Sequence, residues 1–129
     1  MKNADLKRRT QEFALRIIRL YSSLPKHTAA QVIGKQILRS GTSIGANYRE
    51  GCRARSSQEF TAKLGVCLQE LEETAYWLEL LIEANILAKE MIKPVLSEND
   101  ELMAIFVSSI NTLKKRGKLK GKKDPTSEF

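Results

Sequence analysis

The 129-residue sequence has few of the residues that break helices, cross-link chains or bind metals. It contains 3 prolines, 7 glycines, 2 cysteines and 1 histidine. The scarcity of proline and glycine, together with the absence of β-branched or aromatic runs, favours helix throughout and predicts no strand. Cys52 and Cys67 have neither the close spacing of a redox or zinc site nor the density of a secreted disulfide scaffold, so we interpret both as reduced packing residues.

Long apolar runs are missing as well. Charges interrupt the N-terminal residues, which lack the apolar core of a signal peptide, and no segment approaches the run of about 18 apolar residues that a membrane span needs. We therefore expect a cytoplasmic protein. With 42% hydrophobic and 29% charged residues, the composition fits one globular domain.

Four segments carry apolar residues at alternating steps of three and four, which is the spacing of one helix face. The stripes run from Leu6 to Leu24, Ile33 to Gly51, Phe60 to Asn85 and Ile92 to Leu113. The connections between them are short, so consecutive helices should pack side by side. The sequence predicts an all-α fold, an antiparallel up-down-up-down left-handed four-helix bundle over residues 1–117, with the second and third helices longest.

Helix ends are expected at particular residues. Pro25 ends the first helix, and Thr28 is a plausible N-cap of the second. The segment Arg55-Ser56-Ser57-Gln58-Glu59 offers a serine cap with an acidic first turn for the third. Pro94 fits the first turn of the fourth helix, although Ser97 could cap a later start. Gly117 should end that helix, and residues 118–129 should form a disordered basic tail.

The second segment is rich in small residues where a helix should be strongest. Gly41 and Gly45 alone would destabilise an isolated helix by about 2 kcal/mol relative to alanine. We expect close approach of neighbouring helices to offset this, with Ser40 and Asn47 hydrogen-bonded to partners in the core. A phosphate-binding loop is the competing interpretation, but it requires a strand followed by GxxxxGK[ST], and the lysine is absent.

The residues of this region also resemble a known family. The resemblance is carried by SIGANYREG at residues 43–51, followed by Arg55-Ser56 and Glu59-Phe60, and further matches include Leu24-Pro25, Gln36, Arg39-Ser40, Leu64, Glu70-Leu71 and Thr74. They are similar to the four-helix-bundle proteins encoded in intervening sequences of bacterial 23S ribosomal RNA, over about residues 10–115. That family is similar in turn to the accessory variability protein of diversity-generating retroelements.

The resemblance implies an antiparallel four-helix bundle that forms a ring-shaped homopentamer. It also implies binding of nucleic acid and of a nucleic-acid-processing protein, a reverse transcriptase in the retroelement relative, through a basic surface. No enzyme activity is attached to the family, and many of its members have no assigned function.

The charge of the chain is unevenly distributed. The net charge is +7, yet residues 57–87 hold one lysine against six glutamates. Seven of the ten residues from 114 to 123 are basic. These residues either keep the end of the chain soluble or contact phosphates of a nucleic acid. No aromatic residue is interleaved among them, so any nucleic-acid binding should not depend on base sequence. The candidate nucleic-acid contacts are Arg49, Arg53, Arg55, Lys114, Lys115, Arg116, Lys118, Lys120, Lys122 and Lys123.

The acidic third helix has a basic complement on the second helix. We expect Arg39 or Arg53 to meet Glu59, Glu70 or Glu73, either within a subunit or across a subunit boundary. Trp77 projects from the flank of the third helix, where it either covers the bundle edge or anchors an interface. The candidate residues of an oligomer interface are Arg39, Glu59, Glu70, Glu73, Tyr76 and Trp77.

Candidates for catalysis are few. His27 is a lone histidine in a polar turn, and Glu70 and Glu73 lack the Glu-x-x-His motifs of bundle metal sites, so a salt-bridged face is the simpler interpretation. We expect no enzyme activity, no cofactor and no metal. The predicted function is a homo-oligomeric bundle that binds RNA or DNA through its basic surface, and the alternative is a protein–protein scaffold with no nucleic-acid role.

Overall fold

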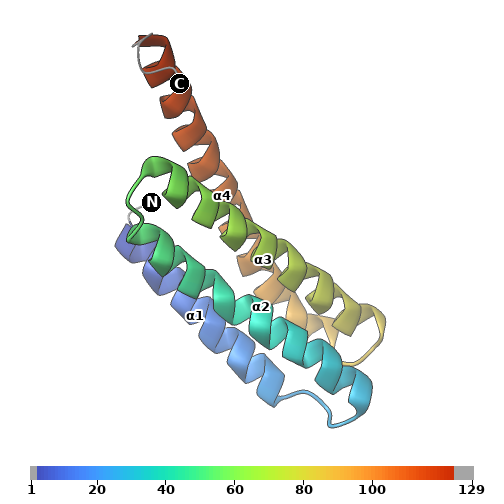
Figure 1. The fold of residues 1–129 in the computed structure, drawn as a ribbon. Helices are drawn as coiled ribbons and strands as arrows, with labels where there is room; N and C mark the ends of the chain where they lie inside the picture. The colour runs from blue at the N-terminus through green and yellow to red at the C-terminus, as the bar shows by residue number, and fades with distance from the viewer. Residues whose placement is uncertain (1–2, 124–129) are drawn as a thin grey trace.

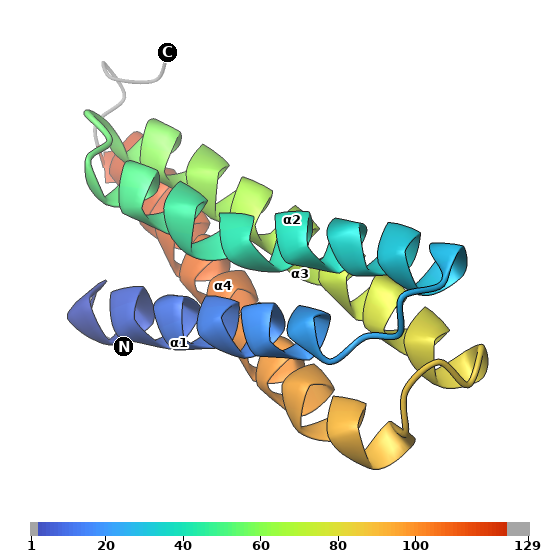
Figure 2. The same cartoon turned by 90° about the horizontal axis from the view of Figure 1, so that it is seen from below.

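The computed structural model describes residues 3–123, and this part of the chain contains four helices and no strand (Figure 1). The helices are α1 (Asn3–Ser22), α2 (Thr28–Cys52), α3 (Ser57–Glu83) and α4 (Lys89–Lys123). Each helix packs against the next, and α1 also meets α4, more sparsely because α4 crosses it at an angle (Figure 2). The all-helical prediction is confirmed.

At the starts of α2 and α3, a side-chain nitrogen or oxygen accepts a backbone N–H that has no partner within the helix. His27, not Thr28, caps α2, because its Nδ1 accepts the Ala30 N–H at 3.3 Å. Thr28 is the first helical residue, so the predicted cap is one position late. The predicted serine cap of α3 is Ser56, whose hydroxyl oxygen accepts the N–H of Glu59 at 3.1 Å. The Glu59 carboxylate in turn accepts the N–H of the residue before the cap at 2.8 Å.

The end of α3 is a left-handed turn. Asn85 has a φ of 56°, and asparagine tolerates this conformation better than most residues. The Ile86 N–H donates to the Leu81 carbonyl at 2.9 Å, and the Asn85 N–H donates to Ile82 at 3.0 Å. This pair of bonds satisfies carbonyls that the last helical turn would leave free and turns the chain toward α4.

The fourth helix differs most from the prediction. It begins at Lys89, so Pro94 lies in its second turn, and Ser97 is well inside it. It also continues past Gly117 to Lys123, so the predicted end at Gly117 is wrong and residues 118–123 are helical. Gly117 does not adopt a positive φ, so nothing at that position turns the chain out of the helix. Residues 124–129 of the predicted tail lie outside the described residues. At 35 residues α4 is longer than α2 and α3, which corrects the expected order of lengths.

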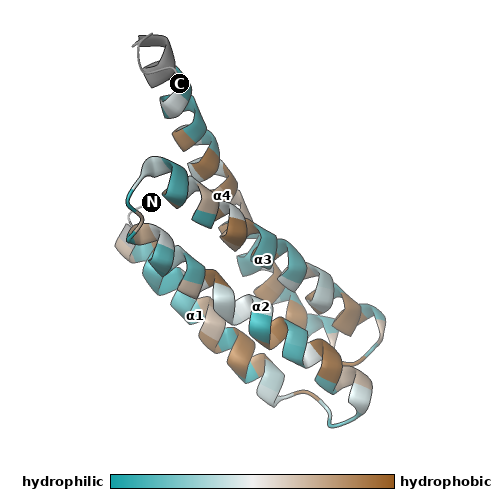
Figure 3. Cartoon of the chain, in the orientation of Figure 1, coloured by the Kyte–Doolittle hydropathy of each residue, from teal (hydrophilic) through white to brown (hydrophobic). Residues whose placement is uncertain are grey.

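The four apolar stripes meet in one core, as predicted. Its fully buried members come from every helix and include Phe13, Ile17, Ile37, Ile44, Leu64, Leu71, Leu78, Leu81, Ile92, Leu102 and Phe106. Figure 3 shows apolar and polar residues alternating along each helix.

The inward face of α2 departs from the predicted stripe at its C-terminal end. Asn47 is only half-buried, and its amide donates to the Ser43 carbonyl of its own helix at 2.9 Å, so the expected core partner is absent. Tyr48, absent from the predicted stripe, is 1% exposed instead, with its ring edge-on to Phe106 at 5.8 Å. Ser40 does meet a core partner, since it accepts the Thr74 hydroxyl at 2.8 Å.

The glycines of α2 lie where neighbouring helices come close. A Cβ on Gly41 would lie 2.7 Å from Ile17 Cγ1, and one on Gly45 would lie 3.1 Å from the hydroxyl oxygen of Thr10, both on α1. Gly51 faces the other neighbour, since a Cβ there would lie 3.1 Å from Lys63 Cβ of α3. Close approach of both neighbours explains the small residues, as predicted.

Candidate nucleic-acid interface

The start of α1, the end of α2, the start of α3 and the far part of α4 converge at one end of the molecule (Figure 1). A hollow there is lined by all four helices, through Leu6 of α1, Tyr48 of α2, Phe60 of α3 and Arg116 of α4. We call this region the basic end, because it brings together the candidate cations of α2, of the α2–α3 turn and of α4. The sequence places these residues far apart, and the fold gathers them.

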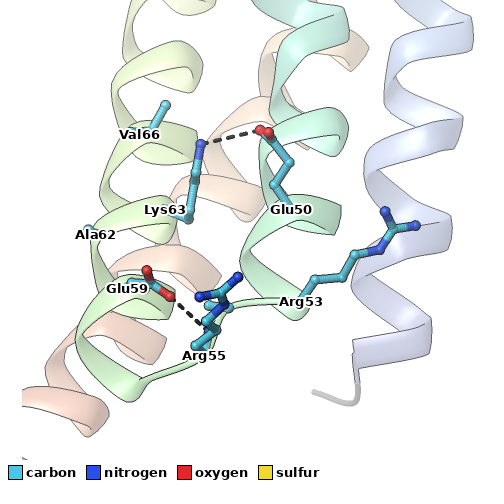
Figure 4. A pocket seen from close by; sticks show the side chains of 8 residues that line it. Glu50, Arg53, Arg55, Glu59, Ala62, Lys63 and Val66 are labelled. Carbon is cyan, nitrogen blue, oxygen red and sulfur yellow. Dashed lines mark hydrogen bonds and ion pairs between the residues drawn. The ribbon is translucent and has the colours of Figure 1, made fainter.

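Arg53 and Arg55 occupy the α2–α3 turn, on the rim of a second pocket (Figure 4). Both side chains are exposed, and neither makes an ion pair among the described residues. Glu59 lies in the same pocket but binds the Arg55 backbone N–H at 2.8 Å. Lys63 is paired with Glu50 at 3.2 Å. Both carboxylates of this pocket thus bind other groups, and neither turn arginine has an ion-pair partner in the part of the chain that the structure describes.

Arg49 lies one turn before Arg53 on α2. Its guanidinium donates to the side-chain oxygen of Gln11 on α1 at 2.7 Å. The amide of Gln11 is neutral, so the contact orients Arg49 without cancelling its charge. Lys7 and Arg8 of α1 are at the same end, although the sequence analysis did not select them. In the sequence they are part of the basic run at residues 7–9. This run indicates a phosphate contact only when the fold brings the start of α1 to the same end as the α2–α3 turn (Figure 1).

The last turns of α4 extend past the α2–α3 turn and away from the other helices (Figure 1). Lys114, Lys115, Arg116 and Lys118 on this part are all exposed. Lys120, Lys122 and Lys123 follow on the same helix. We call residues 114–123 the α4 extension, a helical rod of about 14 Å at 1.5 Å per residue.

The residues predicted for an oligomer interface fall into two groups. Arg39 of α2 forms an ion pair with Glu73 and, at 3.5 Å, one with Glu70. Both glutamates lie on α3 of the same chain (Figure 1). Ser43 also donates to Glu70, at 2.8 Å. The expected contact between the basic and acidic helices is thus confirmed within a subunit for Arg39, while Arg53 and Glu59 take no part in it.

Trp77 extends this network. Its indole N–H donates to the Glu73 carboxylate at 3.0 Å. That hydrogen bond, and then the one from Arg39, hold the pKa of Glu73 below its ordinary value. The same bond to Glu73 raises the pKa of Arg39. Tyr76 stands beside this network, 55% exposed, with its ring centre 5.0 Å from that of Trp77.

A second ion pair joins α1 to α4 and was missed from the sequence. Arg9 donates two hydrogen bonds to Glu98, at 2.7 and 3.1 Å, and a longer one to Glu101 at 3.4 Å. The Arg9 and Glu98 side chains are about four-fifths buried. Because α1 and α4 touch sparsely, this bidentate pair is a principal link between them.

The described residues offer little to catalysis or metal binding. They contain no group of three or more His, Cys, Asp or Glu side chains that could hold a metal ion. Burial raises the pKa of the Cys67 thiol to about 12, and that thiol donates to the Ile44 carbonyl at 3.4 Å. Within the same part of the chain, no helix is long and apolar enough to span a membrane.

These observations define the class of the protein: it is an all-α, four-helix protein with a buried apolar core and a basic end. Residues 2–108 match the family described as 23S rRNA-intervening sequence protein, and the chain belongs to that family. The chain is also similar to a crystal structure of a protein with unknown function from the S23 ribosomal protein family of Bacteroides thetaiotaomicron. The two share 43% identity and a TM-score of 0.76 over 81% of this chain and 96% of that one. No curated protein matches the chain.

Proposed function

We propose that this protein is a non-enzymatic, homo-oligomeric helical bundle that binds nucleic acid through its basic end. The observation that carries the proposal is the meeting of Arg53 and Arg55 with the α4 extension at one end, where the two arginines lack ion pairs among the described residues. Each phosphate neutralised by such a cation releases condensed counterions, which favours binding.

The proposed binding does not depend on base sequence. The candidate contacts at the basic end are guanidinium and ammonium groups, which can contact phosphates in any base sequence. Among the described aromatic residues, Tyr76 has a largely exposed ring, but it does not lie at the basic end. It lies on α3, about 24 Å along the helix from Phe60, which does. Stacking on exposed rings, the usual basis of single-strand preferences, is therefore not a feature of this end.

The arrangement that we propose for the helices is antiparallel, up-down-up-down and left-handed. Its support is that the α1–α2 and α3–α4 connections lie at one end of the bundle while the α2–α3 turn lies at the other (Figure 1). Short connections between packed helices favour this topology.

The oligomer that we propose is a homopentamer, as in the proteins that the sequence resembles, the retroelement accessory protein among them. The outer face of α3 supports an interface, since the exposed ring of Tyr76 stands there beside Trp77, with the ring centres 5.0 Å apart. Exposed aromatic residues are enriched at protein interfaces. Light scattering should give a multiple of the 14.6 kDa chain mass.

Substitution of the exposed ring tests that interface. Tyr76→Glu should lower the mass in solution, because it places a charge in an apolar contact. Met91→Glu on α4, at similar exposure, should leave the mass unchanged. An unchanged mass for Tyr76→Glu would remove α3 from the interface. This face also supports the alternative function, a protein–protein scaffold.

Binding itself is tested by titrating labelled RNA and duplex DNA with the full chain at about 50 and 200 mM salt. Retention at low salt that weakens steeply at high salt is expected. Arg53→Gln with Arg55→Gln should reduce the slope of log affinity against log salt by about 2. Arg16→Gln with Arg19→Gln on α1 is the matched control and should leave the slope unchanged. No retention at low salt would exclude the proposal and leave the scaffold.

A further inference from the structure

The α4 extension carries cations on opposite sides of one helix. Lys114 and Lys118 are four residues apart and lie on one side, with Lys115 next to them. Arg116 lies about 200° around the helix from Lys114, at 100° per residue. Lys120 follows Arg116 at the same four-residue spacing.

The two sides face different surroundings. Arg116 lines the hollow at the basic end together with Ser109 and Thr112 of α4, and with Leu6 and Phe60 of α1 and α3. Lys114 and Lys118 each lie two residues from Arg116, which is about 200° in one direction around the helix and about 160° in the other. They therefore point away from that hollow, and both are exposed. One basic side therefore borders the hollow at the basic end, while the other is open to solvent.

A single phosphate backbone would use only one of these sides. Two backbones with a gap between them would use both, and that is the geometry of a duplex groove. The major groove of B-form DNA is about 12 Å wide, which matches the 10–12 Å diameter of a helix with its side chains. The major groove of A-form RNA is too narrow and deep for a helix.

We infer that the ligand of the basic end is double-stranded DNA, with the α4 extension lying in its major groove and cations on opposite sides of the helix contacting the two backbones. The inference rests on the proposed function and narrows its ligand. One backbone contacts Arg116 on the side of the helix that borders the hollow, and continues to the turn arginines Arg53 and Arg55 at the same end of the molecule. The other contacts Lys114 and Lys118. The contacts are to phosphates, so base sequence does not matter.

The test compares three labelled oligonucleotides of one sequence, duplex DNA, duplex RNA and single-stranded DNA, bound to the full chain at several salt concentrations. We expect duplex DNA to bind about tenfold or more tighter than either of the others. Similar or tighter binding of single-stranded DNA would overturn the inference while leaving the proposed function standing, and so would equal binding of duplex RNA. No binding of any of the three would overturn the proposed function itself.

Paired variants test the two-sided contact. Lys114→Gln with Lys118→Gln removes two charges from one side, and Arg116→Gln removes one charge from the other. The double variant should lower the salt slope for duplex DNA by about 2 and the single variant by about 1, which makes the loss of affinity between 50 and 200 mM salt about twelvefold and about threefold smaller. If only one of the two variants changed the slope, insertion between two backbones would be excluded.

Lys89→Gln with Lys93→Gln is the matched control. These two lysines are exposed and four residues apart near the start of the same helix, at the other end from the basic end. The substitution removes the same charge from α4, so an unchanged slope is expected. An equal decrease in slope would show that net charge alone governs binding, contrary to the inference. Thermal unfolding of each variant confirms that the bundle is intact.

Discussion

Alanine at Gly41 tests whether the α2 backbone packs directly against the Ile17 side chain of α1. A Cβ at this position would lie 2.7 Å from Ile17 Cγ1 and 3.0 Å from its Cγ2, and Ile17 is fully buried. Alanine stabilises a helix interior by about 1 kcal/mol relative to glycine, whereas overpacking a filled core costs about 1–3 kcal/mol. The contact involves branched carbons close to the backbone, so Ile17 has little freedom to move away. We expect Gly41→Ala to lower the free energy of unfolding by up to about 2 kcal/mol.

Gly65→Ala is the matched control, because it makes the same change in the interior of α3 where a Cβ meets nothing within 4 Å. It should stabilise the chain by about 1 kcal/mol. Urea denaturation at one protein concentration measures both variants, and thermal unfolding should show opposite shifts, of about 4 °C per kcal/mol. If Gly41→Ala stabilised the protein as much as Gly65→Ala, the close approach of α1 and α2 would be refuted.

A double-mutant cycle identifies the contact. Ile17→Ala removes the branched side chain that the new Cβ would meet, although it destabilises the core by about 2–5 kcal/mol on its own. In that background Gly41→Ala should become neutral or stabilising. An unchanged penalty would mean that the loss arises elsewhere than at Ile17.

Three further predictions concern side chains that the fold places in distinct environments. Arg9→Ala should lower the free energy of unfolding by about 1 kcal/mol or more, because it breaks the largely buried ion pair between α1 and α4, whereas Arg8→Ala at an exposed pair should have no measurable effect in urea denaturation. Because the pKa of Glu73 is lowered in the folded state, its stabilising contribution is present above its ordinary pKa and is lost as pH falls. The stability difference between the wild type and Glu73→Gln should therefore shrink below about pH 4, and a difference that stayed constant would contradict that assignment. Burial and the raised pKa of Cys67 should protect its thiol from iodoacetamide in the native protein, so mass spectrometry should find native alkylation confined to Cys52.

Periodicity predicted the helices well, because burial of one face is recorded in the sequence as steps of three and four. Ends were harder to predict. The serine cap of α3 was predicted, without a choice between Ser56 and Ser57, because a hydroxyl followed by an acidic first turn is a strong cap signal. His27 was not, since imidazole caps seldom and its neighbour Thr28 is the more usual cap. Gly117 illustrates the opposite error, because glycine at a helix end is common but does not by itself end a helix that lysine-rich segments continue.

The inward turn of Tyr48 and the ion pair of Arg9 depend on tertiary packing. The strict stripe on α2 favoured Asn47, but contact with two neighbouring helices widens the buried arc to include the next residue, and an aromatic ring fills the space beside Phe106. Arg9 finds Glu98 across 89 residues, a separation at which sequence spacing carries no information.

The charge of the chain acquires its meaning from pairing. On sequence alone, the acidic third helix and the basic remainder could cancel anywhere along the bundle. In the structure, Glu70 and Glu73 compensate Arg39 at mid-helix, and Glu98 compensates Arg9. These pairs neutralise charge at two places along the bundle wall, and no ion pair among the described residues reaches Arg53 or Arg55. Exposed cations without an ion-pair partner remain available to an incoming phosphate, and the proposed nucleic-acid contact uses those that the fold gathers at the end where the α4 extension projects.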